Sequence, residues 1–141
     1  MHALTIVCPV DYSDCSKRAL RYAGALAEHF RARLIVLHVI DPMLVAATAV
    51  QQVDLLGPDG EDELMSFVTD HLPTSRRDHQ LQRVLKIGSP SAEILRSAES
   101  QGADLLVMGT HGFSGARKLF YGSTLRAVLA GAHIPVLAVP L

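Results

Sequence analysis

The sequence predicts an α/β protein built on an open, five-stranded parallel sheet with helices on both faces. Five apolar runs of strand length alternate with four segments of helical periodicity along the 141 residues. This alternation is typical of a parallel sheet whose strands are joined by helical crossovers. The run 33–41 is almost continuously apolar, as expected for a strand that is covered on both faces. We expect the strand order 3-2-1-4-5, within one domain that spans 1–141.

The first half of the chain is expected to contain two strands and two helices. Residues 4–10 form the first strand, and Ser13 is a good N-cap for a helix whose apolar positions recur at helical spacing. Residues 33–41 form the second strand, and 61–71 the second helix. Residues 42–60 are apolar but poorly periodic and end in a Gly-Pro-Asp-Gly turn signal. This segment is either a lid over a ligand or a surface for a partner.

The second half repeats the pattern with clearer boundaries. Residues 81–88 form a third strand, and Ser89 with Pro90 begins a helix that Gly102 ends. The remaining elements are a strand at 103–109, a helix at 123–132 and a last strand at 134–140.

Composition and charge exclude several classes of function. The net charge of −1 provides no basic surface for a nucleic acid or for an acidic membrane. No apolar run reaches the roughly 20 residues that span a bilayer, and the N-terminus does not have the pattern of a signal peptide. Cys8 and Cys15 follow no metal-binding spacing, which favours two free thiols in a reducing cytoplasm. We therefore expect a cytoplasmic protein that binds neither nucleic acid nor membrane.

The stretch 109–124, GTHGFSGARKLFYGST, is the strongest functional signal. It follows the fourth strand and ends in Gly-Ser-Thr before a helix, and free N–H groups at a helix start form a seat for an anion. In an open parallel sheet, ligands bind beyond the carboxyl ends of the strands where the winding reverses. The ends of the first, second and fourth strands would meet there, which predicts a phosphate-bearing ligand.

Three known motifs do not fit this stretch. A Walker A loop requires a lysine where Ser123 follows Gly122, and a dinucleotide fingerprint requires glycines at another spacing after the first strand. A nucleophile elbow requires one residue between Ser114 and the next glycine, yet Gly115 follows directly. The phosphate seat is therefore of another type.

Each residue of the site also has a simpler interpretation. Gly109 and Gly112 can serve turn geometry alone, and Asp11 can cap the first helix. His111 is equally compatible with a solvated loop, whereas His38, inside an apolar strand, is better explained as a core histidine than as a ligand. Leu125 either narrows the phosphate seat or turns into the core.

The spacing Gly109-x2-Gly112-x9-Gly122-Ser123 resembles the nucleotide loop of the universal stress protein family. The resemblance extends over nearly the whole chain and includes Val10-Asp11 with Ser13 near the start. Its other segments are Leu37-His38-Val39, Gly88-Ser89-Pro90, the strand at 103–109 and Ile134-Pro135-Val136-Leu137-Ala138-Val139. It implies a Rossmann-like fold of the adenine nucleotide alpha-hydrolase type.

The resemblance also implies a ligand and the residues that bind it. The ligand would be ATP, or ADP or AMP, with Mg²⁺ or Mn²⁺ bridging the phosphates. Asp11 and the Val39 backbone would address the adenine. The base and ribose would be lined by Pro9, Val10, Met108 and Gly109. The phosphates would be met by His111, Gly112, Gly122, Ser123, Thr124 and Leu125. A homodimer would form through the C-terminal edge strand, Ile134 to Val139.

Three functions remain open on these grounds. The first is a nucleotide-dependent switch in the stress response with little or no turnover, since no general base or arginine finger is evident. The second is a slow ATPase, in which Asp11, Asp41 or His111 would organise water or metal. The third is an interaction module that signals through its dimer face and retains a vestigial nucleotide pocket.

Overall fold

The computed structural model describes residues 3–43, 58–72, 80–112 and 122–141. The segment 42–60, for which a lid or partner surface is expected, lies mostly outside these residues, as does most of the glycine loop with Arg117 and Lys118. No helix in the described ranges has the length and apolar character needed to cross a membrane.

The described chain forms one parallel sheet with the predicted strand order β3-β2-β1-β4-β5. Its strands are β1 (Thr5–Pro9), β2 (Arg33–Ile40), β3 (Leu81–Ile87), β4 (Leu105–Gly109) and β5 (Val136–Val139). β1 lies at the centre and pairs with β2 on one side and β4 on the other. Beyond the carboxyl ends of β1 and β4 the chain leaves toward opposite faces, so the predicted switch point is present.

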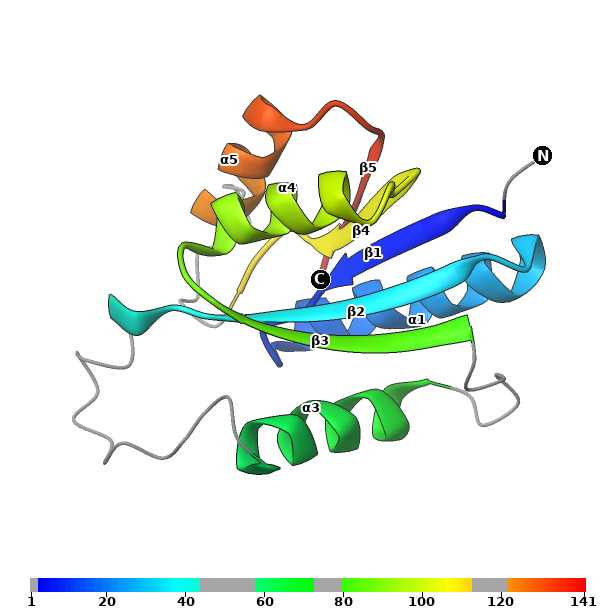
Figure 1. Cartoon of the computed structure of the whole chain (residues 1–141), viewed down its shortest axis with the longest axis horizontal. Coiled ribbons are helices and arrows are strands. Elements are labelled where there is room, and N and C mark those ends of the chain that lie inside the picture. Colours follow the sequence, from blue (N-terminus) through cyan, green and yellow to red (C-terminus); the bar gives the residue numbers. More distant parts are fainter. Residues whose placement is uncertain (1–2, 44–57, 73–79, 113–121) are drawn as a thin grey trace.

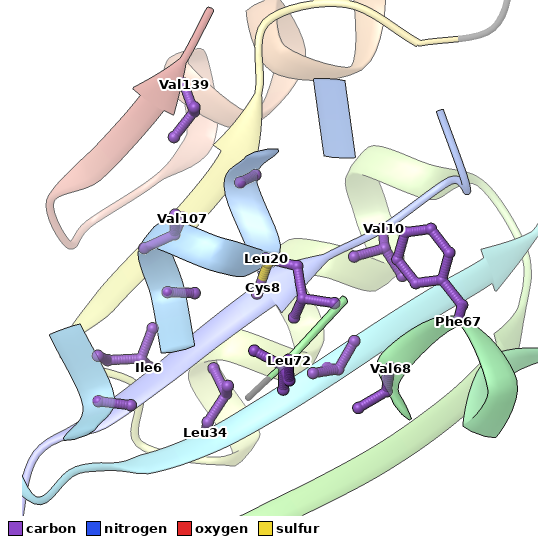
Figure 2. Packing of buried hydrophobic residues seen from close by; sticks show 14 of the residues in the cluster. Ile6, Cys8, Val10, Leu20, Leu34, Phe67, Val68, Leu72, Val107 and Val139 are labelled. Atoms are coloured by element: carbon purple, nitrogen blue, oxygen red, sulfur yellow. The ribbon is translucent and has the colours of Figure 1, made fainter. Parts of the chain in front are cut away.

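Helices cover both faces, as expected from the apolar character of β2. α1 (Asp14–Phe30) and α3 (Pro58–His71) lie on one face, and α4 (Pro90–Ser100) and α5 (Ser123–Gly131) on the other (Figure 1). Strand residues alternate between the two sides: Cys8 and Val36 join the cluster under α1 and α3, which Figure 2 shows, whereas Val7 and Ile35 join the cluster under α4 and α5.

The helix boundaries follow local chemistry. Ser13 caps α1 as predicted, because its side chain accepts a hydrogen bond from the Ser16 amide. The predicted start of the second helix at residue 61 is wrong: α3 begins at Pro58. The Gly-Pro-Asp-Gly sequence indicated a turn, but proline also fits the first turn of a helix, where its missing N–H is not needed. The other elements begin and end within two residues of the predicted positions.

Candidate functional site

A cavity of about 690 Å³ lies at the carboxyl ends of β1, β2 and β4, within the range of about 300–1,000 Å³ typical of small-molecule sites. All twelve residues predicted to contact the ligand line it. They are Pro9, Val10, Asp11, Val39, Met108, Gly109, His111, Gly112, Gly122, Ser123, Thr124 and Leu125. The structure thus brings together residues from both ends of the sequence, although their contact with a ligand remains a prediction.

The amino end of α5 provides backbone donors to this cavity. The first intrahelical bond of α5 runs from the Arg126 N–H to the Gly122 carbonyl at 3.1 Å, and Gly122 provides no side-chain cap. No acceptor for the N–H groups of Ser123, Thr124 and Leu125 is found among the described residues. Three unpaired amides at a helix start, with the positive end of the helix dipole, favour an anion.

The Gly122 amide, unlike the three that follow it, is paired within the protein. The Gly122 N–H already donates to the Thr110 carbonyl at 2.7 Å, so it holds the start of α5 against the end of β4. Leu125 is 1% exposed and packs with Val7 and Leu106 in the core under α4 and α5. Of the two alternatives for Leu125, the structure therefore favours the one in which its side chain turns into the core.

Two of the glycines make room for protein atoms. A Cβ atom at Gly109 would lie 2.8 Å from Cys15 Sγ, closer than real Cβ contacts come, and a tight 3.1 Å from the Cys15 carbonyl carbon. A Cβ atom at Gly112 would overlap the Asp11 carboxylate. Both glycines therefore bring the loop after β4 against the chain that follows β1, and this contact shapes the cavity.

The Asp11 carboxylate is fixed by the start of α1. Its Oδ1 atom accepts hydrogen bonds from the Ser13 backbone N–H at 3.0 Å and from the Ser13 hydroxyl. Oδ2 faces Gly112, and the residue lines the cavity. The two interpretations of Asp11, helix entry and ligand contact, are thus compatible, since one oxygen serves the helix entry and the side chain still borders the cavity.

Tyr12 and His38 form an aromatic wall that the sequence did not reveal. Their ring centroids are 4.3 Å apart, and Tyr12 also meets Phe67 of α3 at 5.0 Å. The positive φ of Tyr12, 67°, is uncommon for a bulky residue, and its neighbouring rings hold it there. Burial, and then the nearby Glu63 carboxylate, raise the pKa of the Tyr12 phenol, so the phenol stays protonated.

His38 is only half-buried and lines the cavity, whereas a core position was expected. Its Nδ1 atom lies 2.8 Å from the Val10 carbonyl. Because a carbonyl only accepts, Nδ1 carries the proton and donates. The signal for this role was the position of His38 one residue before Val39, at the end of a strand.

The described wall carries three carboxylates, those of Asp11, Asp41 and Glu63. No group of three His, Cys, Asp or Glu side chains in the described ranges is arranged to hold a metal ion. Magnesium, however, is commonly bound through one or two carboxylates and the phosphates of a substrate. The donor set therefore fits a cation that arrives with the nucleotide.

The two cysteines take no part in the cavity wall. Cys8 is fully buried, and burial raises the pKa of its thiol, so it is inert as expected. Cys15 is 3% exposed, and its Sγ donates to the Val139 carbonyl at 3.1 Å. Although Cys15 lies near a helix start, which favours a thiolate, its burial argues against reactivity, because thiol reactivity requires access as well as a favourable dipole.

Comparison with known proteins agrees with this arrangement. The model of the Universal stress protein family matches residues 3–140. Universal stress protein A homolog 1 of Coxiella burnetii is 33% identical over 146 residues, covering 99% of this chain and 97% of the relative. Universal stress protein MJ0577 of Methanocaldococcus jannaschii is 26% identical over 151 residues, covering 95% of this chain and 93% of the relative.

Solved structures share the fold. The structure of MJ0577 aligns with 100% of this chain over 98% of its own length, with a TM-score of 0.79 and 23% sequence identity. A universal stress protein solved in complex with cAMP aligns with 99% of this chain over 98% of its own length, with a TM-score of 0.66 and 27% sequence identity.

Proposed function

Since the chain belongs to the universal stress protein family, a family of stress-response proteins, we propose that it binds an adenine nucleotide in the cavity at the carboxyl ends of β1, β2 and β4. The nucleotide is ATP, ADP or AMP, and binding rather than turnover is the function. The observation that carries the proposal is the unpaired set of amides at the start of α5, which opens on this cavity and suits a phosphate. The cAMP complex of a relative supports an adenine ligand.

The predicted residues form two groups, one that contacts the base and ribose of the nucleotide and one that contacts its phosphates. Asp11 and the Val39 backbone address the adenine, while Pro9, Val10, Met108 and Gly109 border the base and ribose. The amides of Ser123, Thr124 and Leu125 meet the phosphates, with His111 and Gly112 beside them. Magnesium or manganese accompanies the phosphates and offsets their repulsion by the three carboxylates of the wall.

We further propose that nucleotide binding acts as a switch within a homodimer. The cavity is connected to α3, since Gly60 and Glu63 line it and Tyr12 meets Phe67. β5 is the edge strand of the sheet, and an edge strand can pair with a second chain. A ligand that changes the position of residues in the cavity wall would thereby affect both α3 and the proposed dimer contact at β5. Action in the cytoplasm is consistent with two free, buried cysteines.

Calorimetry of the whole chain with ATP, ADP and AMP at millimolar magnesium tests the binding proposal. We expect heat and a thermal shift with at least one of the three, and no phosphate release above the buffer rate. The absence of both heat and thermal shift for all three nucleotides would end the proposal. Steady phosphate release that is lost in Gly122→Val would favour a slow ATPase instead.

A further inference from the structure

Thr110, which follows β4 and was not singled out from the sequence, joins three parts of the structure. It is 4% exposed and lines the cavity. Its N–H donates to the Val139 carbonyl at 3.0 Å, and its own carbonyl accepts from the Gly122 N–H at 2.7 Å. Its Oγ1 atom lies 2.8 Å from His111 Nδ1. One residue therefore connects the end of β5, the start of α5 and a histidine of the cavity.

The hydrogen bonds around Thr110 limit its hydroxyl proton to two positions. Cys15 Sγ donates its hydrogen to the Val139 carbonyl. The Thr110 hydroxyl has one hydrogen to donate, and the two candidate acceptors are His111 Nδ1 at 2.8 Å and Cys15 Sγ at 3.7 Å. The contact with His111 exists in either direction, and the reverse direction would place the imidazole proton on Nδ1 and turn the Thr110 hydroxyl toward Cys15. An imidazole nitrogen is a good acceptor at 2.8 Å, which favours the direction in which the hydroxyl donates to His111 Nδ1.

This direction fixes the state of the imidazole. A neutral histidine that accepts at Nδ1 carries its proton at Nε2. Nε2 of His111 is buried and has no hydrogen-bond partner among the residues that the structure describes, which is unfavourable for a polar group. His111 lies beside the start of α5, since a Cβ atom at Gly122 would be 3.9 Å from the His111 Cα. A phosphate at the α5 amides would supply the missing acceptor.

We propose that Thr110 is a positioning residue for the nucleotide phosphate. It holds His111 in the tautomer whose Nε2–H donates to a phosphate oxygen, and it ties this contact to the end of β5 through the Val139 carbonyl. The inference rests on the proposed nucleotide binding and adds the tautomer of His111 and the residue that sets it.

The first test is nuclear magnetic resonance of the ¹⁵N-labelled whole chain, with the His111 signals assigned by their loss in His111→Gln. We expect a protonated, pyrrole-type Nε2 and an unprotonated Nδ1 in the free protein, and a shift of the Nε2–H signal when AMP is added. A protonated Nδ1, which would mean that Thr110 accepts from His111 and donates to Cys15 instead, overturns the inference whether or not the Thr110 variants fold.

The second test compares affinities for AMP and adenosine, which differ by the phosphate. Thr110→Val removes the hydroxyl and keeps the shape, Thr110→Ser restores the hydroxyl, and Thr69→Val on the exposed face of α3 is the matched control. We expect Thr110→Val and His111→Gln to weaken AMP by about tenfold and to leave adenosine unchanged, while Thr110→Ser and Thr69→Val bind as the wild type does.

The outcomes separate this inference from the proposed function. Wild-type protein that binds none of ATP, ADP and AMP refutes the proposed function itself. Wild-type protein that binds AMP, with Thr110→Val equal to it, refutes the positioning role. Equal weakening of AMP and adenosine in Thr110→Val also refutes it, because that result indicates a general structural defect.

Discussion

Gly112 and the Asp11 carboxylate occupy adjoining space, so that a Cβ atom at residue 112 would overlap Asp11 Oδ2. The carboxylate cannot simply turn away, because its other oxygen is bonded to the Ser13 N–H and hydroxyl. The loop after β4 and the chain after β1 are thus fitted to each other where Asp11, the proposed adenine contact, adjoins Gly112, which is proposed to lie beside the phosphates.

Gly112→Ala is expected to lower the free energy of unfolding by about 1–3 kcal/mol, the usual effect of overpacking, and to weaken adenosine binding. Asp11→Ala removes the overlapping atom, so the same glycine substitution should be less harmful in that background. Urea unfolding of the four proteins of this cycle measures the coupling. Additive effects of the two substitutions would show that the contact does not constrain the loop.

Ser13→Ala is expected to destabilise the protein by about 1–2 kcal/mol, because the side chain accepts from the Ser16 amide at the start of α1. The chain contains its own control. Ser89 occupies the equivalent position before α4 but makes no side-chain capping bond, so Ser89→Ala should change stability by less than about 0.5 kcal/mol. Equal losses for the two variants in thermal or urea unfolding would contradict this difference.

Ser123→Pro tests whether the first amide of α5 donates to the phosphate. Ser123 is the first residue of α5, where proline is tolerated, and Gly122 before it is already extended, with φ −61° and ψ 155°, as the residue before a proline should be. Removing this N–H should weaken AMP by about tenfold if it donates to phosphate. Ser123→Ala keeps the amide and removes only the hydroxyl.

The comparison of Ser123→Pro with Ser123→Ala isolates the backbone contribution. We expect adenosine to bind both variants equally, with only the proline variant losing affinity for AMP in calorimetry. If Ser123→Ala loses as much affinity as Ser123→Pro, the hydroxyl rather than the amide makes the contact.

The fold could be predicted because each strand and helix has its own short-range sequence pattern. Much of the site, in contrast, depends on contacts between residues far apart in the sequence, which such patterns do not indicate. Gly109 and Gly112 stood out in the sequence, but the sequence could not say that their close neighbours are Cys15 and Asp11. Thr110 escaped notice for the same reason, since two of its partners, Gly122 and Val139, lie 12 and 29 residues away. His38 forms the cavity wall together with Tyr12. The positive φ of Tyr12 could not be expected from the sequence, because such a φ is usual for glycine and asparagine but not for tyrosine.

His71 is expected to make stability fall as the solution becomes acidic. Burial, and then Lys17 and Arg21 on α1, lower the pKa of His71 below 6.5, against a smaller opposing effect of Asp70. Its Nδ1 atom is buried and has no hydrogen-bond partner in the described part of the chain. The unfolded chain therefore binds a proton at higher pH than the folded chain does, and stability is lost as pH falls through 6.5 toward the folded pKa.

His71→Asn should remove this part of the acid sensitivity. The change in unfolding free energy between pH 7.5 and pH 5.5 should be smaller in His71→Asn than in the wild type, whereas His29→Asn, at an exposed position of α1, should keep the wild-type slope. Parallel slopes for all three proteins would show that protonation of His71 does not oppose folding.

Leu137→Lys tests the proposed dimer at the edge strand. β5 pairs with β4 on one side only, and Leu137 is 38% exposed, whereas Val136 packs against the core under α4 and α5. A lysine at 137 should thus repel a second strand without disturbing the fold, while Val136→Lys should weaken the dimer and destabilise the subunit as well. Met65→Lys, at a 45% exposed position on α3, is the control for added charge.

Light scattering across a dilution series should report a dimer for the wild type and Met65→Lys, and a shift toward the monomer mass for Leu137→Lys. Thermal unfolding distinguishes the two edge variants, because only Val136→Lys should unfold at a markedly lower temperature. In a two-fold dimer each substitution adds one lysine from each subunit to the contact, so the two added charges repel each other. An unchanged mass for both edge variants would therefore place the dimer contact elsewhere.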